Sequence, residues 1–484
     1  MASTTPEWEA LQGEISGDVI LPESSDYESA RKSAIARFHD VRPQALVSCE
    51  TSADISETIS FARRSGLRAA IRSGGHCFAG RSSTEGIVIE VSPMRTVSVS
   101  GGAATVGAGA RLGEVYDALD ERCLTIPTGC GSTVGISGLT LGGGLGILGR
   151  KHGLTSDHLL SARIIFADGS IVECDEHHRG DLFWALRGAG GNFGVVTSLV
   201  FRTLPAPDAT AFHLLWPHAH AAAVIQAWQA WAPSAPDELA ASLLLTAPGN
   251  PDRQPAVNLF GAMIGTESDA AGLLDGLVAR VGENPTAAFR KHMSYRETKR
   301  YLAELGDAMA GEDDRLGEGS PDDPTAQGCP FSRSEFFRRP LPIEAVAALV
   351  ENLSRDRVSG QSRELDFSPW GGAYNRVPAE DTAFAHRDEL FLLQHTTVVD
   401  PYASAAERED AKSWMARSWD TVHPYGSGRV YPNFRDPDLK NWARAYYGLN
   451  YYRLVRIKSK YDPDDFFRYP QSLPSCILGG NPPA

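Results

Sequence analysis

The sequence predicts an α+β protein built from two or three domains. The chain has 484 residues, and a domain usually contains about 100 to 200 residues. Short β-like runs alternate with helical patterns over residues 45–202. After Pro205 and Pro207 the helical patterns become longer and are interspersed with strands, which indicates a second unit made of a sheet and helices.

The composition excludes several classes of protein. A hydrophobic fraction of 42% with 22% charged residues is ordinary for a globular protein, so disorder along the whole chain is excluded. The net charge of −14 disfavours a nucleic-acid scaffold, which needs a basic surface. The seven cysteines form no CxxC pair, so neither a disulfide framework nor a zinc module is expected.

The sequence also gives no sign of export or of a membrane span. The first residues are acidic and lack the apolar run of a secretory signal. The uncharged stretch 123–149 contains nine glycines and would make a poor spanning helix. We therefore expect a cytoplasmic protein that binds neither membrane nor nucleic acid.

Within residues 45–202 each element is predicted from its pattern. The β-like runs are 45–51, 67–72, 87–91, 96–99, 104–110 and 195–202. Asp54 is expected to cap a helix that ends at Gly66, and apolar residues at helical spacing predict a second helix over 112–119. Residues 162–173 read as a hairpin around Asp168-Gly169, and a helical turn ends at Gly188.

Beyond Pro207 the elements are longer. Helical spacing is found at Val224/Trp228/Trp231, Leu273/Leu274/Leu277 and Ala345/Leu349/Leu353. Strands are expected at 241–247, 256–265 and 389–399. The stretch from Gly306 to Pro330, rich in Gly, Asp and Pro, is expected to be a long loop or lid.

The glycines are concentrated in one part of the chain. Of the 47 glycines, 26 lie between Gly66 and Gly194, which indicates backbone that turns sharply or approaches a ligand closely. Residues 144–149 match GxGxxG, but no β-branched strand precedes them, and neither Asp157 nor Asp168 ends a convincing second strand as a dinucleotide site requires. A Rossmann site is therefore disfavoured, whereas a nest of amides that faces phosphates or a flavin edge is compatible with the pattern.

Four segments carry a family resemblance, in this order along the chain: IRSGGHCFAGRSS, VGISGLTLGGGLG, DLFWALRGAGGNFGVVT and YYGLNYYRLVRIKSKYDPDDFFRYPQS. Together they resemble the berberine-bridge-enzyme-like branch of the FAD-linked oxidases with the vanillyl-alcohol-oxidase fold. The resemblance implies a two-domain fold with a PCMH-type FAD-binding domain. That domain would combine residues 1–205 with a C-terminal segment, 440–484. Residues 206–439 would form a substrate domain, an antiparallel sheet flanked by helices.

The resemblance also implies the cofactor and its ligands. FAD would be attached covalently to His76 of the GGH motif, a link that raises the reduction potential of a flavin. Backbone amides of the turn Arg72-Ser73-Gly74-Gly75 would hold the pyrophosphate. The further cofactor contacts expected from the resemblance are Thr133, Gly135, Gly138, Gly143, Val196 and Asn450.

A second covalent link is less clear in this sequence. Many relatives attach the flavin also through the cysteine of a P-x-G-x-C-P-x-V-G segment. Counted back from Val134-Gly135, that position is Gly131 here, and Cys130 stands one residue early. A shift by one residue in an extended segment reverses the direction of the side chain. We therefore expect one bond, through His76, while a second bond through Cys130 stays open beside the alternative of a small buried residue.

The resemblance places catalytic and substrate-facing groups in the last third of the chain. Tyr446 or Tyr447 would be the base, although a phenol with a pKa near 10 needs that pKa lowered to work at neutral pH. The alternative is a packed aromatic stripe, because Tyr447, Asn450 and Lys458 belong to one predicted helix face. The candidate substrate contacts are Asp366, Trp370 and Gln394.

The reaction that these features favour is oxidation of a small molecule with dioxygen as acceptor. A carbon next to a hydroxyl or amine of a sugar, glycosylated or aromatic natural product would give hydride to the flavin, and O2 would be reduced to H2O2. Two alternatives stay open. One is an oxygenating flavoenzyme of polyketide-type metabolism with Thr133 beside the flavin, and the other is a flavin-binding protein without catalytic activity.

Overall fold

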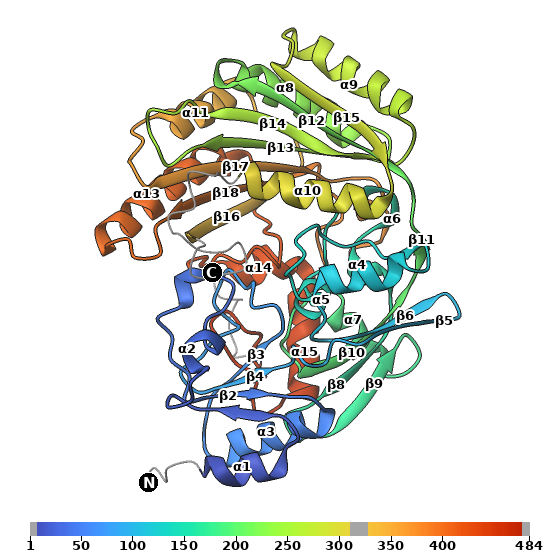
Figure 1. Cartoon of the computed structure of the whole chain (residues 1–484), viewed down its shortest axis with the longest axis vertical. Coiled ribbons are helices and arrows are strands. Elements are labelled where there is room, and N and C mark those ends of the chain that lie inside the picture. The colour runs from blue at the N-terminus through green and yellow to red at the C-terminus, as the bar shows by residue number, and fades with distance from the viewer. Residues whose placement is uncertain (1–6, 310–327, 477–484) are drawn as a thin grey trace.

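A computed structural model describes residues 7–309 and 328–476 of the chain. Two bodies are stacked along the longest axis (Figure 1). One contains the N-terminal strands and helices together with the C-terminal helices, and the other is built around a single large sheet. We call them the flavin domain and the substrate domain, after the roles that the sequence predicts.

The first sheet of the flavin domain has the order β1-β2-β4-β3. Its strands are Asp18–Ile20 (β1), Ala45–Ser48 (β2), Ala69–Arg72 (β3) and Ile87–Glu90 (β4). β2, β4 and β3 are parallel, and the helix Ser52–Arg64 (α3) connects β2 to β3. The N-cap of α3 is Thr51, and Asp54 completes a capping box with it, so the expected cap at Asp54 is wrong by three residues. Trp8 of α1 (Trp8–Glu14) packs on Phe61 of α3.

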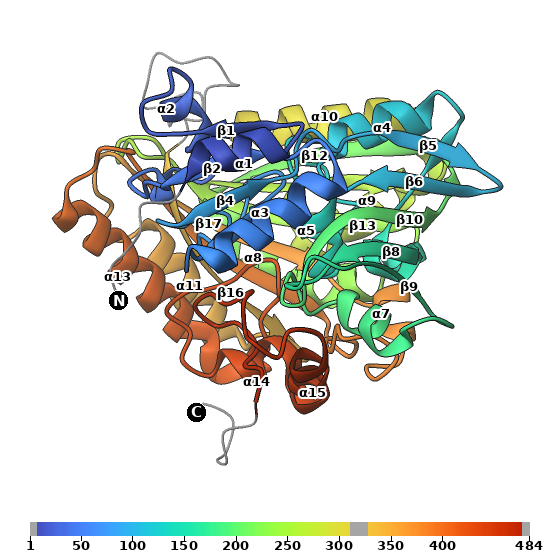
Figure 2. The same ribbon diagram turned by 90° about the horizontal axis from the view of Figure 1, so that it is seen from below.

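The second sheet of this domain is antiparallel and has the order β5-β6-β10-β8-β9 (Figure 2). Its strands are Val97–Ser100 (β5), Ala103–Gly107 (β6), Leu159–Ile165 (β8), Ile171–Asp175 (β9) and Val195–Arg202 (β10). The hairpin β8–β9 confirms the predicted turn at Asp168-Gly169, where Gly169 has φ +81°. The remaining elements up to residue 205 are Tyr27–Ala30 (α2), Leu112–Asp120 (α4), Leu124–Thr125 (β7), Ile136–Leu141 (α5), Gly149–His152 (α6), Gly180–Leu186 (α7) and Leu204–Pro205 (β11).

The substrate domain is a seven-stranded antiparallel sheet of order β15-β12-β14-β13-β17-β18-β16. Its strands are Ala209–Pro217 (β12), Leu239–Ala247 (β13), Ala256–Met263 (β14), Ala287–Met293 (β15), Cys329–Phe337 (β16), Gln361–Pro369 (β17) and Phe391–Val399 (β18). Its longer helices are Ala221–Trp231 (α8), Glu267–Val281 (α9), Tyr295–Met309 (α10), Ile343–Ser354 (α11) and Ala405–Val422 (α13), with a short α12 at Ala373–Arg376.

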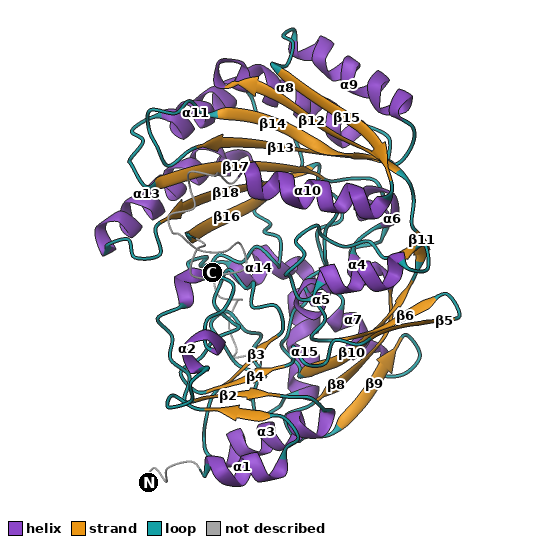
Figure 3. Ribbon diagram, in the orientation of Figure 1, coloured by secondary structure: helices purple, strands orange, loops and turns teal. Residues whose placement is uncertain are grey.

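The two faces of this sheet pack against different parts of the protein. Alternate residues of β13, such as Leu243 and Leu245, form one apolar core with α8, α9, α11 and α13 (Figure 3). α10 lies on the opposite face, where Leu302 packs with Ala262 of β14 and with Ile147 of the flavin domain. The opposite face therefore looks toward the flavin domain.

Polar contacts fix the two domains against each other. Arg387 makes two hydrogen bonds of 2.7 and 2.9 Å to the carboxylate of Asp157, and both side chains are more than nine-tenths buried. Arg150 of α6 donates in the other direction, to the carbonyls of Pro233 and Ala235 in the substrate domain. Because each arginine makes at least two hydrogen bonds, these buried contacts fix the orientation of one domain relative to the other.

The chain returns to the flavin domain before its end. Val430 already packs in the core of that domain, and Trp442–Tyr447 (α14) and Tyr451–Tyr461 (α15) follow. The predicted single helix face through Tyr447 and Lys458 is broken at Gly448, whose φ of +50° and ψ of −131° interrupt the helix.

The predicted elements differ from the structure mainly by omission. The strands and helices predicted before residue 205 are present within a few residues, as are α8, α9, α11, β13, β14 and β18. The sequence did not predict α1, β1, α2, α5 and α6 of the flavin domain, or β12, β15, β16, α10 and α13 of the substrate domain. Most of the loop or lid expected over 306–330 lies outside the described residues. In the part of the chain that the structure describes, no helix has both the length and the apolarity to cross a bilayer.

The return of the C-terminal segment depends on one buried cation. Lys458 donates to the carboxylate of Asp462 (2.5 Å) and to the carbonyls of Asn192 (2.8 Å) and Phe467 (3.0 Å), and neither ion is exposed. Lys458→Ala leaves Asp462 buried without its cation, so we expect a loss of about 3–5 kcal/mol in the free energy of unfolding. Lys460→Ala removes an exposed ion pair with Asp181 and should change the free energy of unfolding by less than about 1 kcal/mol. Urea denaturation measures both, and equal losses would contradict this role of Lys458.

Candidate active site

A cavity of about 670 Å³ in the flavin domain is lined mainly by segments from four parts of the chain. They are the turn after β3, the glycine-rich stretch before and within α5, the loop before β10, and the C-terminal segment. Ten glycines line it, mostly from the part of the sequence where glycine is concentrated. The wall therefore exposes backbone amides at close range.

The charged residues in the wall of this cavity are all positive. Arg68, Arg81, Arg435 and Arg468 line the cavity, and no Asp or Glu is among its lining residues in the described chain. Arg81 Nε and Arg435 Nη1 are buried nitrogens without a hydrogen-bond partner. A buried donor without an acceptor is costly unless a ligand supplies one. The cavity is thus suited to an anionic ligand such as a diphosphate.

The turn after β3 packs directly on the segment before α5. A Cβ on Gly74 would lie 2.2 Å from the backbone nitrogen of Gly135, and a Cβ on Gly135 would lie 2.3 Å from Ser73 Oγ. Ser73 Oγ donates to the carbonyl of Ala108, which also accepts from Ser137 Oγ. Of the residues predicted to bind the cofactor, these contacts place Ser73, Gly74, Gly75, His76, Gly135, Gly138 and Val196 in the wall.

His76 lies at the end of this turn with one ring nitrogen engaged. Its Nε2 is 3.0 Å from Thr133 Oγ1, which leaves Nδ1 as the second ring nitrogen. Burial and the neighbouring Arg111 lower the pKa of His76 to about 4. The imidazole is therefore neutral near pH 7 and is a nucleophile rather than a cation. Thr133 contacts His76 and is itself not a wall residue.

Cys130 faces away from this cavity. Its Sγ lies 3.9 Å from Lys299 Nζ and packs in a cluster with α10, whereas the next residue, Gly131, lines the cavity. This is the reversal expected from a shift of one position. The geometry thus does not bring the thiol of Cys130 to the cofactor side.

Three other predicted cofactor contacts are placed elsewhere. The guanidinium of Arg72 donates to the carbonyls of Ala30, Arg31 and Ser82. A Cβ on Gly143 would meet the ring of Phe384 at 2.9 Å, and Asn450 Nδ2 donates to carbonyls of the loop 379–383. None of the three lines the cavity. Arg72, Gly143 and Asn450 therefore hold the surrounding loops in place.

The amides of the GxGxxG stretch are also used within the protein. Tyr431 Oη accepts from the backbone nitrogens of Gly144 (3.0 Å) and Leu145 (3.1 Å), and Tyr374 Oη accepts from that of Gly146 (3.1 Å). The expected nest of amides open to phosphate is therefore not formed at this stretch. These two tyrosines dock the stretch on the substrate domain and on the segment that follows it.

Neither tyrosine predicted as the base lines the cavity. Tyr446 Oη accepts from the backbone nitrogen of Asp436 (2.9 Å) and donates to its carbonyl (3.2 Å), and burial raises the pKa of Tyr446 to about 12. Tyr447 Oη donates to the carbonyl of Ala189 and accepts from Arg435. We correct the predicted placement: Tyr446 is part of the core, and Tyr447 reaches the cavity only through Arg435.

The predicted substrate contacts divide into two kinds. Asp366 and Gln394 are paired across β17 and β18, on the face that looks toward the flavin domain, because Leu392 of the same face packs with Tyr431. Asp366 Oδ1 is shielded from solvent and has no hydrogen-bond partner, and burial raises the pKa of Asp366 to about 6. Trp370 is different, because it is 1% exposed and stacked on Tyr374 in an aromatic core.

Comparisons with known proteins identify the family. A family model described as FAD binding domain matches residues 43–175, and one described as berberine and berberine like matches residues 430–474. An uncharacterized FAD-linked oxidoreductase of Bacillus subtilis, YvdP, is 33% identical over 95% of this chain and 98% of its own. Berberine bridge enzyme-like 6 of Arabidopsis thaliana is 30% identical over 89% of this chain and 81% of its own. The chain belongs to the berberine-bridge-enzyme-like family of FAD-linked oxidoreductases.

Membership in this family agrees with the fold and the cavity. Glucooligosaccharide oxidase of Acremonium strictum, whose structure is titled for its 6-S-cysteinyl, 8α-N1-histidyl FAD, superposes with a TM-score of 0.83 at 25% identity, over 98% of this chain and 100% of that one. The oxidoreductase therefore has the two-domain α+β fold of PCMH-type flavoenzymes, and FAD is its cofactor. The arginines and the glycine amides of the wall fit that cofactor, because FAD carries a diphosphate and needs close backbone approach.

The sequence did not point to the arginines of the wall. Arg81 lies within the segment IRSGGHCFAGRSS but was given no role there, and Arg435 lies in none of the four segments that carry the resemblance. A search for cations within a few residues of predicted cofactor loops would have found Arg81. The place of Arg435 in the cavity wall can be recognised only from the tertiary structure, because the C-terminal segment folds back onto the flavin domain.

The close contact between Gly74 and Gly135 leads to a prediction about single methyl groups. Gly135→Ala forces a methyl group against Ser73 and Gly74, and overpacking of this kind costs about 1–3 kcal/mol. Gly138→Ala is the matched control, since a Cβ there meets nothing within 4 Å, and alanine favours a helix over glycine by up to about 1 kcal/mol. Urea unfolding of the two variants should show a loss for Gly135→Ala alone. A loss of equal size in both would disprove the contact.

Proposed function

We propose that this enzyme oxidises an alcohol or amine carbon of a sugar, glycosylated or aromatic natural product to the carbonyl or imine, with dioxygen as acceptor and hydrogen peroxide as second product. The observation that carries the proposal is Asp366 on the sheet face above the flavin domain, because its Oδ1 is shielded from solvent and has no hydrogen-bond partner in the protein. The likeness to glucooligosaccharide oxidase supports a hydroxyl-bearing substrate. When bound, FAD supplies the hydride acceptor and passes the electrons to dioxygen.

Asp366 has the properties of the base in this reaction. Removal of hydride from a carbon requires that the neighbouring hydroxyl or amine lose its proton, and a carboxylate with a pKa near 6 is ionised at neutral pH yet basic enough to accept it. Gln394 lies opposite in register and donates to Ser332 Oγ (2.6 Å). Its amide oxygen remains an acceptor for a substrate hydroxyl.

His76 would hold the cofactor covalently, through Nδ1. The neutral ring nitrogen would replace one hydrogen of the flavin methyl group, with that hydrogen lost as a proton and the two electrons of the C–H bond passing through the flavin to dioxygen. Thr133 holds the ring in place by binding Nε2. Since Cys130 faces Lys299, we propose one bond rather than two. Small-molecule substrate and dioxygen are then the partners of the reaction.

The attachment is tested by denaturing the protein and asking whether the flavin stays with the polypeptide. We expect wild-type protein and Cys130→Ala to retain it and His76→Ala to release it. Gly131→Cys restores the thiol at the position that faces the cavity, where a Cβ meets only Val134 Cγ2 at 3.2 Å. His76→Ala combined with Gly131→Cys should therefore retain flavin again. Release from the wild type, or retention by His76→Ala through Cys130, would contradict the single link.

The base is tested by Asp366→Asn in the loaded enzyme. Loss of a general base reduces kcat by a factor of about 10² to 10⁴. In the wild type kcat should rise as the pH increases through about 6, because only the ionised carboxylate accepts a proton. Tyr446→Phe serves as the control and should lower stability while the pH profile keeps its shape.

A second measurement separates this role from a structural one. Because the pKa of Asp366 is raised from 3.8 to about 6 in the folded state, this group lowers the free energy of unfolding as the pH increases from about 3.8 to about 6, and the loss is complete above that. Asp366→Asn should thus be as stable as the wild type or more so above pH 6, although it is less active. Peroxide formed in proportion to substrate is expected. An absence of peroxide together with an oxygenated product would favour the oxygenating alternative, and a flavin that no donor bleaches would favour a binding protein.

A further inference from the structure

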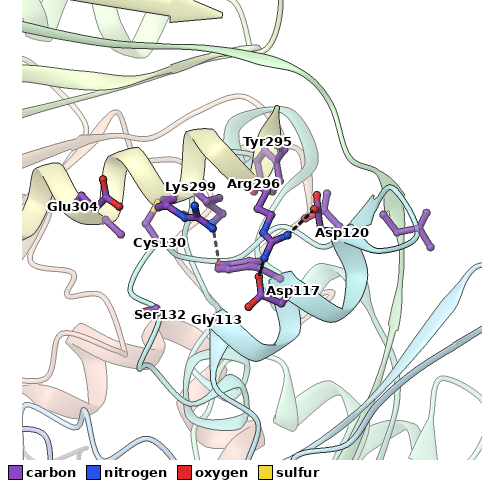
Figure 4. A pocket seen from close by; sticks show the side chains of 14 residues that line it. Gly113, Asp117, Asp120, Cys130, Ser132, Tyr295, Arg296, Lys299 and Glu304 are labelled. Carbon is purple, nitrogen blue, oxygen red and sulfur yellow. Dashed lines mark hydrogen bonds and ion pairs between the residues drawn. The ribbon is translucent and has the colours of Figure 1, made fainter. Parts of the chain in front are cut away.

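A second, smaller cavity of about 310 Å³ lies between α4 and α10, behind the wall of the flavin cavity (Figure 4). Tyr116 and Cys130 come from the flavin domain, and Tyr295 and Lys299 come from α10 of the substrate domain. Lys299 is only 4% exposed, although it is a lysine on a helix with a polar outer side. Burial of an ammonium group is costly and calls for an explanation.

The ammonium of Lys299 uses all three of its protons on the flavin domain. It donates to the carbonyls of Thr128 (2.8 Å) and Gly129 (2.7 Å) and to Tyr116 Oη (2.9 Å). Tyr116 Oη in turn contacts Thr128 Oγ1 and the carbonyl of Gly129. All of these partners are formally uncharged oxygens, so the cation is retained by hydrogen bonds and not by an ion pair.

The segment Thr128–Cys130, which Lys299 contacts, also contributes to the wall of the flavin cavity. Gly129 and Gly131 line the larger cavity, whereas the carbonyls of Thr128 and Gly129 and the thiol of Cys130 face Lys299. One short segment therefore has the cofactor on one side and the substrate domain's cation on the other. A shift of α10 would move this wall directly.

We propose that Lys299 is a positioning residue, which clamps the segment Thr128–Cys130 from the substrate domain and so sets the position of the flavin-cavity wall. Through this clamp the docking of α10 controls the surroundings of the cofactor. The inference rests on FAD occupying the larger cavity. It does not depend on which substrate is oxidised or on which residue is the base.

The test compares Lys299→Met with Arg300→Met. Arg300 is the next residue of α10, is exposed, and makes none of the hydrogen bonds to the clamped segment. We expect Lys299→Met to change the visible absorption and fluorescence of the bound flavin and to slow flavin attachment by a factor of about 10 to 100, because small displacements of a reacting group have effects of this size. Arg300→Met should match the wild type. Lys299→Arg keeps the charge and the donors and should restore part of the loss.

Tyr116→Phe is a second test, which applies even if Lys299→Met does not fold. It removes one acceptor of the ammonium while the ring stays, so a smaller change in the same direction is expected. Wild-type flavin spectra and attachment rates in every soluble variant, with only a lower melting temperature, would overturn the proposal and leave Lys299 as a contact between domains. These readouts need no substrate, so an incorrect substrate class would not affect them.

Discussion

The site depends on one backbone contact, the approach of the turn after β3 to the residue that precedes α5. Gly74 and Gly135 lie so close that neither can carry a side chain, since a Cβ on either would come within 2.4 Å of the backbone nitrogen of the other. This contact places His76 beside Thr133 and aligns the amides of both segments on one cavity. A larger residue at either position would separate the two segments, and with them the two halves of the wall.

Close approach to glycine backbone also explains how the substrate domain is docked on the flavin domain. The sequence of the glycine-rich stretch 144–149 suggests amides that could serve a ligand, but Tyr431 and Tyr374 accept the hydrogen bonds of three of them. Glycine is required there because the tyrosine ring comes close: a Cβ on Gly149 would lie 1.7 Å from Tyr374 Oη. High glycine content thus marks two different things in this chain, approach to a cofactor and approach to another domain.

This distinction also limits what the sequence could predict. Most of the strands between residues 45 and 202, the turn Ser73–His76 and the reversed Cys130 followed from local patterns and a family resemblance. The strands β12, β15 and β16 were missed because they are defined by long-range pairing. The residues of β15 are almost all exposed, and β16 carries Arg333 and Glu335. Arg435 and Lys299 could not be assigned either, because their partners lie in another domain or in a segment brought back from far along the chain.

Electrostatics favour a carboxyl as the base over the tyrosine that the sequence predicts. Burial raises the pKa of a carboxyl and of a phenol alike, since it disfavours both anions. For Asp366 that increase leads to a pKa of about 6, within the range where a base accepts and releases a proton near neutral pH. For Tyr446 it leads to about 12, where the phenol stays protonated, and even the neighbouring Arg435 does not reverse this. The same burial therefore leaves Asp366 with a pKa that suits the proposed base and leaves Tyr446 protonated, which is why the proposal assigns the substrate proton to the aspartate on the sheet face.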